Sequence, residues 1–311
     1  MSESKLLPLP VCQIDPVQKS PADFKYPRWF GGSASCMAVA VSHPFDLIKV
    51  RMQTVPNGDK QGSIRTGILV VQSEGIKGLY RGISAGFMRS LTYGTARIAI
   101  YEELKKSATT PDKSLSVPAL GTMAAVSGFI GAIFGTPSDI ANIRMQNDKS
   151  LPMQHRRNYR HVFDAWYQMK RHEGWRAFIQ GIWPNCFRSG IMTASQLASY
   201  DAFKRLLQSI GDTTEERPLI HFSASLLASL IATTVSNPMD VIRTQLMSSS
   251  KKVSVLTIVR GLFGAEGIRW IFRGWTPSFV RLGPQTIATL VALEQHKRLY
   301  RNWVAGERFS T

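Results

Sequence analysis

With 38 lysines and arginines against 21 aspartates and glutamates, the 311-residue chain has a net charge of +17. An excess of this size indicates an anionic partner: nucleic acid, an anionic lipid or an anionic small molecule. The three cysteines, Cys12, Cys36 and Cys186, are too scattered to indicate a disulfide framework or a metal site.

The first 27 residues contain five prolines and no long apolar run. Residues 1–27 are therefore predicted to form a flexible N-terminal tail. The segment has the features neither of a secretory signal nor of an arginine-rich amphipathic presequence.

Residues 28–108 are predicted to form the first of three repeats. A short apolar stretch leads into the motif PFDLIKVRMQ, which starts at Pro44. The motif EGIKGLYRG follows at Glu74, and an amphipathic stretch over 83–101 leads into YEELK. This order of apolar stretch, proline motif, glycine motif and second apolar stretch is the unit that recurs.

The same order returns in residues 116–209 and again in residues 218–302. The second copy reads PSDIANIRMQ, EGWRAFIQG and YDAFK, and the third reads PMDVIRTQLM, EGIRWIFRG and LEQHK. Self-similarity at a fixed period means that one structural unit is built three times. We therefore expect one body made of three modules.

Two stretches, 116–135 and 218–236, have about twenty residues and at most one ionisable group each, which suits a hydrocarbon core of ~30 Å. The second stretches of the repeats are amphipathic, which explains the mean hydropathy of only −0.08. Pairs of small residues four apart would let the helices approach closely; they are Ala34/Ala38, Ser127/Gly131 and Ala228/Ala232. The predicted fold is an all-α membrane protein with six transmembrane helices in three pseudo-threefold repeats, each a span, a short surface helix and a span.

Charged residues recur at the ends of these spans. The proline motifs predict a ring of ion pairs between neighbouring helices, in which Asn142 stands where a base is expected and would make a weaker hydrogen bond. This proline-motif ring comprises Asp46, Lys49, Asp139, Asn142, Asp240 and Arg243. A second, outer set comprises Glu102, Lys105, Asp201, Lys204, Glu294 and Lys297. Two gates that close alternately suit a transporter. The alternatives are ordinary charged helix ends and pairs that satisfy each other within one helix.

An arginine stands seven residues after the last glycine of each glycine motif: Arg89, Arg188 and Arg281. Arginine inside a membrane costs ~2.5–3.5 kcal/mol on insertion scales and usually has a functional role. These central arginines predict an anion site, because the guanidinium fork matches carboxylate and phosphate. The alternative is that they snorkel or pair with acids. Further substrate contacts are predicted at Tyr93, Arg97, Gln196 and Gln285, by their helical offsets from the central arginines.

From about residue 25 to residue 300 the chain resembles the mitochondrial carrier family, on its three Pro-x-Asp-x-x-Lys/Arg patterns followed by Glu-Gly…Gly patterns. Within the family, NIRMQND, MTASQ and FRGWTPSFVRLGP resemble the fungal dicarboxylate carriers. The resemblance implies a six-helix exchanger of the mitochondrial inner membrane that works by alternating access. It implies that the central arginines are substrate contacts, that the proline-motif ring is the matrix gate and that the outer set is the cytoplasmic gate.

The resemblance also implies supporting residues. Gln245 matches a glutamine that braces the matrix gate, and Tyr101 and Tyr200 match tyrosines that brace the cytoplasmic gate, whereas Leu293 replaces the third tyrosine. Cardiolipin is the lipid that the family binds near the matrix surface. Ile179 and Gln180 depart there from the aromatic and basic residues expected in repeat two.

The favoured function is exchange of a C4 dicarboxylate, such as malate or succinate, for phosphate or another small dianion, by a monomer. The alternatives within the class are a carrier of oxoglutarate or of a tricarboxylate, and an uncoupling-protein-like anion or proton carrier. A nucleic-acid binder is disfavoured because the basic residues do not gather in one module. A soluble helical scaffold is disfavoured by the apolar segments. No motif of an enzyme, a cofactor or a metal site is present.

Overall fold

The computed structural model describes residues 29–54, 62–108, 116–210, 218–250 and 253–309. Within these ranges the chain folds into α-helices and short 3-10 helices, without β-strands. The predicted all-α fold is confirmed. The predicted tail, residues 1–27, lies outside the described residues.

Each repeat contributes two long helices joined through a short helix. The long helices have between 26 and 35 residues, which at 1.5 Å per residue exceeds the ~30 Å of a hydrocarbon core. They are α1 (Trp29–Thr54), α3 (Ile83–Ala108), α4 (Val117–Asn147), α6 (Ile182–Ile210), α7 (Pro218–Ser248) and α9 (Trp275–Phe309). The short helices are α2 (Ser63–Glu74), α5 (Val162–Glu173) and α8 (Val255–Glu266).

Two segments of the described chain are apolar enough to qualify as membrane spans by composition alone: Pro118–Ser150 and Ser223–Ser248. Within the described residues, α1, α3, α6 and α9 do not qualify by this measure. The three motif prolines lie inside α1, α4 and α7 rather than at their ends. The first span of repeat one is therefore longer than its apolar stretch, because it continues through the proline motif.

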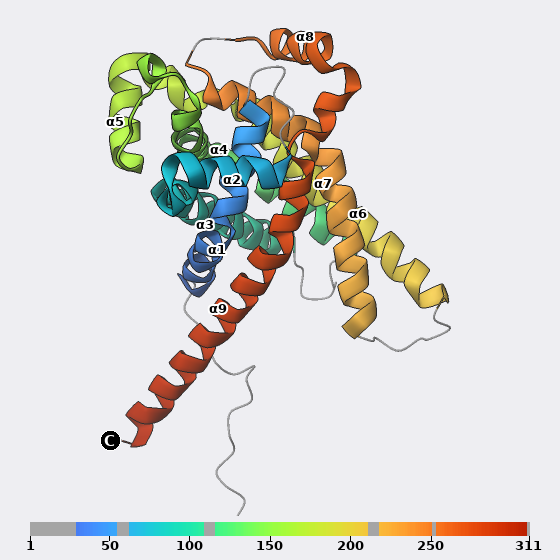
Figure 1. The fold of residues 1–311 in the computed structure, drawn as a ribbon. Helices are drawn as coiled ribbons and strands as arrows, with labels where there is room; N and C mark the ends of the chain where they lie inside the picture. The colour runs from blue at the N-terminus through green and yellow to red at the C-terminus, as the bar shows by residue number, and fades with distance from the viewer. Residues whose placement is uncertain (1–28, 55–61, 109–115, 211–217, 251–252, 310–311) are drawn as a thin grey trace, which may run out of the picture.

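The long helices form a closed ring in the order of the sequence. Helix α1 packs against α3, α3 against α4, α4 against α6, α6 against α7 and α9 against both α7 and α1. The short helices lie toward one end of the molecule, and the C-terminus of α9 lies at the other, where α9 and α6 diverge (Figure 1). The residues of the three proline motifs lie at the end that carries the short helices.

The first and the last glycine of each glycine motif have left-handed backbone conformations, with φ between 58° and 86°. This region favours glycine because a Cβ atom is strained there. The first glycine ends the short helix, and the last precedes the following long helix. The repeated glycines therefore set the path between the two long helices of each repeat; they are Gly75, Gly82, Gly174, Gly181, Gly267 and Gly274.

The small residues predicted to allow close packing are all buried in the described structure. Helices α3 and α4 approach each other closely. A Cβ atom added at Gly131 would lie 3.2 Å from the backbone nitrogen of Arg97, and one at Gly135 would lie 3.0 Å from the Cβ atom of Tyr93. Glycine on α4 therefore brings α3 near enough to place Tyr93 and Arg97 in the interior.

Gly131→Val is expected to lower the melting temperature of the purified protein by several degrees. Overpacking costs ~1–3 kcal/mol, and each kcal/mol shifts the melting temperature by about 2–4 °C. Gly94→Val on α3 is the matched control, because a Cβ atom at Gly94 meets nothing within 4 Å. Equal melting temperatures for the two variants would contradict the close packing of α3 on α4.

Candidate functional site

Two ion pairs of the proline-motif ring join helices of different repeats. The Nζ atom of Lys49 on α1 lies 2.7 Å from Oδ2 of Asp240 on α7. The Nη2 atom of Arg243 on α7 lies 2.6 Å from Oδ1 of Asp139 on α4. All four side chains are largely buried, so water screens these pairs weakly. The structure thus closes this end of the interior with links between α1, α7 and α4.

The third link differs from the prediction that Asn142 hydrogen-bonds across the ring. Among the described residues, the side chain of Asn142 accepts a hydrogen bond from Gln146 on its own helix, at 3.1 Å. Asp46 instead accepts a hydrogen bond from Nη1 of Arg281 on α9, at 2.6 Å. An amide is a weaker competitor for a carboxylate than a guanidinium, which explains why Asp46 turns toward Arg281.

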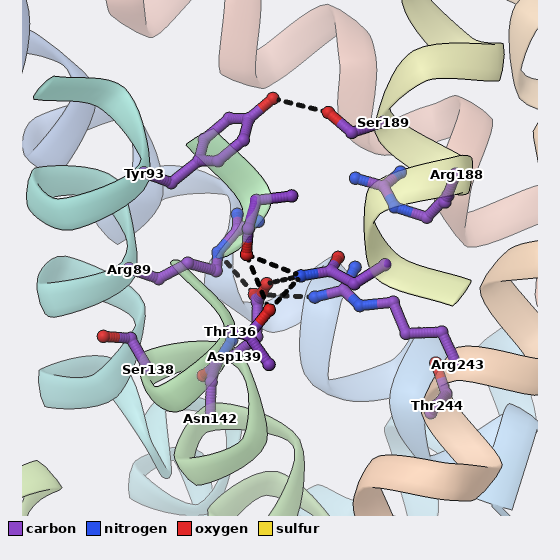
Figure 2. A network of polar contacts seen from close by, with 12 residues as sticks. Arg89, Tyr93, Thr136, Ser138, Asp139, Asn142, Arg188, Ser189, Arg243 and Thr244 are labelled. Atoms are coloured by element: carbon purple, nitrogen blue, oxygen red, sulfur yellow. Dashed lines mark hydrogen bonds and ion pairs between the residues drawn. The ribbon is translucent and has the colours of Figure 1, made fainter. Parts of the chain in front are cut away.

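The three central arginines converge on the acids of the ring. The Nε atom of Arg89 lies 3.7 Å from Oδ1 of Asp139, and the Nε atom of Arg188 lies 3.2 Å from Oδ1 of Asp240. Each arginine therefore meets the acid of the following repeat, as Arg281 does with Asp46. Figure 2 shows Arg89 and Arg243 meeting at Asp139, with Arg188 on the facing helix. The alternative that these arginines pair with acids describes this arrangement, and the acids are those of the proline-motif ring.

The protein meets only part of the hydrogen-bonding capacity of the central arginines. The Nε atoms of Arg89, Arg188 and Arg281 are buried and make no hydrogen bond of good geometry among the described residues, although those of Arg89 and Arg188 face carboxylates at 3.7 Å and 3.2 Å. Such donors are costly to leave unmet. The cavity that these arginines line together with the ring has a volume of about 50 Å³. In this closed state the site is too small for an organic acid, because ligand pockets typically measure about 300–1,000 Å³.

The remaining predicted substrate residues lie along the same interior. The hydroxyl of Tyr93 on α3 lies 2.9 Å from the hydroxyl of Ser189 on α6 (Figure 2). Arg97 and Gln196 line one cavity of about 280 Å³ together with Tyr200. The structure thus brings Arg97 and Gln196 together. Gln285 lies half-buried on α9, and its role toward a substrate stays a prediction.

The outer set lies near the opposite ends of α3, α6 and α9. Glu294 pairs at 3.6 Å with Arg301, which is outside the predicted set. Tyr101 and Tyr200 are half-buried, as is Leu293 at the third position. This end of the molecule is the one where helices diverge in Figure 1. A ring built by Glu102, Lys105, Asp201, Lys204, Glu294 and Lys297 stays a prediction.

Gln245 has a different contact from the predicted one. Its Nε2 atom donates to the backbone carbonyl of Gln53 at 2.6 Å. Thr244 next to it donates to the side chain of Gln53 at 2.8 Å. Gln245 therefore holds the end of α1 against α7 in this state, and a brace on the gate itself is not among the described contacts.

Sequence reasoning missed a set of ion pairs that holds each repeat together. The glutamate of each glycine motif binds an arginine: Glu74 binds Arg51 at 2.5 Å, Glu173 binds Arg144 at 2.7 Å and Glu266 binds Arg273 at 2.6 Å. Arg51 and Arg144 stand seven residues after their motif prolines. This repeated offset was the available signal. In repeat three that position is Gln245, and Glu266 turns to Arg273.

Asn185 on α6 was also missed. Its side-chain nitrogen donates to Oδ2 of Asp139 and to the hydroxyl of Thr136, both at 3.0 Å. The equivalent positions in the other repeats are Gly86 and Ser278, so no repeated pattern marked it. Asn185 fixes the carboxylate that Arg89 and Arg243 share.

Three pairs of long helices in a ring, with buried ion pairs between repeats, define a membrane transporter built from three repeats. The model of the family described as mitochondrial carrier protein matches residues 27–111, 113–211 and 214–303. The chain belongs to this family. It is a transporter rather than an enzyme, and a multi-pass protein of the mitochondrial inner membrane.

Named relatives cover most of the chain. It is 49% identical over 281 residues to the mitochondrial citrate transporter F of Aspergillus niger, which covers 89% of this chain and 90% of that protein. It is 40% identical to the mitochondrial dicarboxylate transporter of Saccharomyces cerevisiae, over 89% of this chain and 93% of that protein. It is 34% identical to the mitochondrial 2-oxoglutarate/malate carrier protein of Bos taurus, over 91% and 92% respectively.

Proposed function

We propose that the protein exchanges small carboxylates across the inner membrane, with C4 dicarboxylates such as malate and succinate moving against phosphate or another small dianion. The observation that carries the proposal is the excess of cationic side chains over carboxylates at the small cavity on which the three central arginines converge. A carboxylate or phosphate supplies the negative charge and the paired acceptors that guanidinium groups bind. Relatives named as dicarboxylate transporters support the same substrate class.

The local charge balance favours a dianion. The cavity at the gate is lined by five cationic side chains and three carboxylates, which leaves an excess of two positive charges. The cations are Lys49, Arg89, Arg188, Arg243 and Arg281, and the acids are Asp46, Asp139 and Asp240. A substrate with two negative charges balances this excess.

The proposed transport mechanism starts from a state in which the interior is closed at one end and open at the other. In this state the proline-motif ring closes the matrix side, and the outer ends of the helices diverge (Figure 1). A substrate that enters from the cytoplasmic side reaches the central arginines and competes for them with the acids of the ring. The matrix side then opens as the outer set closes, and exchange follows because the return step also needs an anion at the arginines.

Citrate is the second candidate substrate. Arg97 lies two helical turns beyond Arg89, about 12 Å along the helix, and lines the cavity of about 280 Å³. A tricarboxylate would place two carboxylates at the central arginines and the third at Arg97. The relative named as a citrate transporter, 49% identical, supports this candidate.

We propose that the carrier is a monomer and that cardiolipin binds at its matrix end. A cavity of about 430 Å³ there is lined by apolar residues of α2 and by three arginines against one carboxylate, Glu266, which pairs with Arg273. Arg269 and the apolar lining suit a lipid phosphate and its chains. In repeat two the side chain of Gln180 accepts a hydrogen bond from Arg144 at 3.3 Å. That repeat therefore offers a less basic lipid contact.

The test is uptake of labelled malate into liposomes that contain the purified protein. Parallel batches are preloaded with phosphate, malate, oxoglutarate, citrate or buffer. Uptake that needs internal phosphate or malate is the expected result. Uptake into empty liposomes would contradict exchange. Absent malate uptake, with uptake once citrate or oxoglutarate carries the label, would overturn the proposed substrate.

Arg97→Gln separates the two candidate substrates. If Arg97 holds a third carboxylate, the variant loses about tenfold or more of citrate exchange, because a hydrogen bond to a charged group contributes ~1.5–3 kcal/mol. Malate exchange is expected to fall less than threefold. The ratio of the two rates in one preparation is the measurement, and Arg298→Gln, an exposed arginine on α9, is the control. An equal loss of both rates would remove Arg97 from substrate selection.

A further inference from the structure

The proline-motif ring lacks one base, in repeat two. The pairing pattern of the other two repeats shows which acid this base would serve. The base of each repeat pairs with the acid of the preceding repeat, as Lys49 does with Asp240 and Arg243 does with Asp139. By this rule residue 142 would serve Asp46. That residue is an asparagine, and its side chain is engaged by Gln146.

Arg281 fills the gap. Its Nη1 atom donates to Asp46 at 2.6 Å, whereas Arg188 and Arg89 stand at 3.2 Å and 3.7 Å from their acids. Charge-assisted hydrogen bonds of this length are the strong ones. The Asp46 and Arg281 side chains are only 11% and 17% exposed. The contact joins α1 to α9, two helices that pack along each other.

We propose that Arg281 serves both as a substrate contact and as the third base of the matrix gate. An anionic substrate then binds Arg281 only when the ion pair between Arg281 and Asp46 breaks. Loss of this ion pair removes a link between α1 and α9. The inference deepens the proposed function and rests on it for the role of the central arginines.

The other two arginines lack this double role. When a substrate binds Arg188, Asp240 keeps Lys49, and when it binds Arg89, Asp139 keeps Arg243 and Asn185. Asp46 differs from the other two acids, because its only ion pair among the described residues is with a central arginine. A ligand shifts a conformational equilibrium by its differential affinity for the two states. Here the difference in substrate affinity between the closed and the open state arises mainly at the contact between α1 and α9.

The test is a double-mutant cycle on thermal stability in detergent without substrate, with Asp46→Asn and Arg281→Gln. If the two residues form a gate pair, the double variant loses about 2–4 °C less in melting temperature than the sum of the single losses, since contacting residues couple. The comparison is the cycle of Asp139→Asn with Arg89→Gln. Its coupling is expected to be clearly smaller than that of Asp46 with Arg281, because Arg89 stands 3.7 Å from Asp139 and Asp139 keeps Arg243.

The same double-mutant cycle is then measured in the Asn142→Lys variant, which restores the missing base. The new base would take over Asp46 and leave Arg281 to the substrate, so the coupling between Asp46 and Arg281 should fall below about 1 °C. In the same variant the concentration of malate that gives half-maximal thermal stabilisation should fall severalfold, while the exchange rate falls because the gate has three links. If Asp46→Asn does not fold, Asp46→Glu with Arg281→Lys carries the same cycle.

Additive effects of Asp46→Asn and Arg281→Gln would overturn the inference, as would coupling that persists unchanged beside Asn142→Lys. The cycle is measured without substrate, so it tests the gate pair whatever the carrier transports. Failure of the proposed function is read separately, from absent malate exchange by the unaltered protein. A gate pair that is coupled while malate stabilisation does not respond to Asn142→Lys would also contradict the double role.

Discussion

Arg188→Ala is expected to lower carboxylate exchange by about 100-fold or more while the protein stays folded and inserted. The variant removes one of three guanidinium groups that face the interior. Loss of two charge-assisted hydrogen bonds, at ~1.5–3 kcal/mol each, corresponds to at least that factor. Folding is expected to survive because Asp240 keeps its 2.7 Å ion pair with Lys49. No buried carboxylate of the described ring is left without a cation.

The measurement is the initial rate of malate exchange in liposomes, paired with the melting temperature in detergent. Arg205→Ala is the control, since it removes the same charge from an exposed position of the same helix. Arg188→Lys keeps the charge but loses the fork, so an intermediate rate is expected. Exchange by Arg188→Ala at the rate of the unaltered protein would remove Arg188 from the substrate site.

The repeats are sufficient to predict the fold and the depth of the charged residues. Residues at equal offsets in three copies of one unit lie at equal depth, so their spacing alone predicts that Arg89, Arg188 and Arg281 lie together. The identity of the partner across the interior is not predictable in the same way. It depends on which side of each helix faces its neighbour, and the packing of α1 on α9 and of α3 on α4 sets that direction.

The gap at Asn142 illustrates the limit. The sequence indicates a missing base, and a weaker hydrogen bond in its place is the natural expectation. In the structure Asp46 instead accepts a hydrogen bond from Arg281, which is more than two hundred residues away in the chain. The role of Asn185 was not predictable for a related reason. Its side chain donates a hydrogen bond to Asp139 at 3.0 Å, but no polar residue recurs at this position in all three repeats to mark it.

The ion pairs between the glutamates and the arginines of the repeats have a structural role that the transport mechanism does not use. Arg144 is the largest fully buried side chain in the described structure. It binds both carboxylate oxygens of Glu173, at 2.7 Å and 2.8 Å, and the backbone carbonyls of Met247 and Ser249. Arg144 thus ties α4 to α5 within repeat two and to the end of α7 in repeat three.

Arg144→Ala is therefore expected to lower the free energy of unfolding by about 3–5 kcal/mol, because it leaves Glu173 and two carbonyls without their donor in a buried place. Burial also raises the pKa of the neighbouring Tyr159 hydroxyl, so this group stays neutral and cannot replace the positive charge that Glu173 loses. Thermal unfolding can be followed with a thiol-reactive dye in a background with Cys12→Ser and Cys36→Ser, since Cys36 is partly exposed whereas Cys186 is only 1% exposed when folded.

The control is Lys106→Ala, which removes one side of an exposed pair with Glu103 and is expected to change the melting temperature by no more than about 2 °C. Arg144→Lys separates charge from geometry: it keeps the cation but cannot form the paired bonds to Glu173, so its loss should lie between those of the other two variants. Equal melting temperatures for Arg144→Ala and Lys106→Ala would show that the link from α4 to α5 and α7 contributes nothing to stability. A large loss in Arg144→Ala, a smaller one in Arg144→Lys and none in Lys106→Ala would show that the paired bonds of Arg144 hold α4 to α5 and to the end of α7, a structural role separate from that of the central arginines.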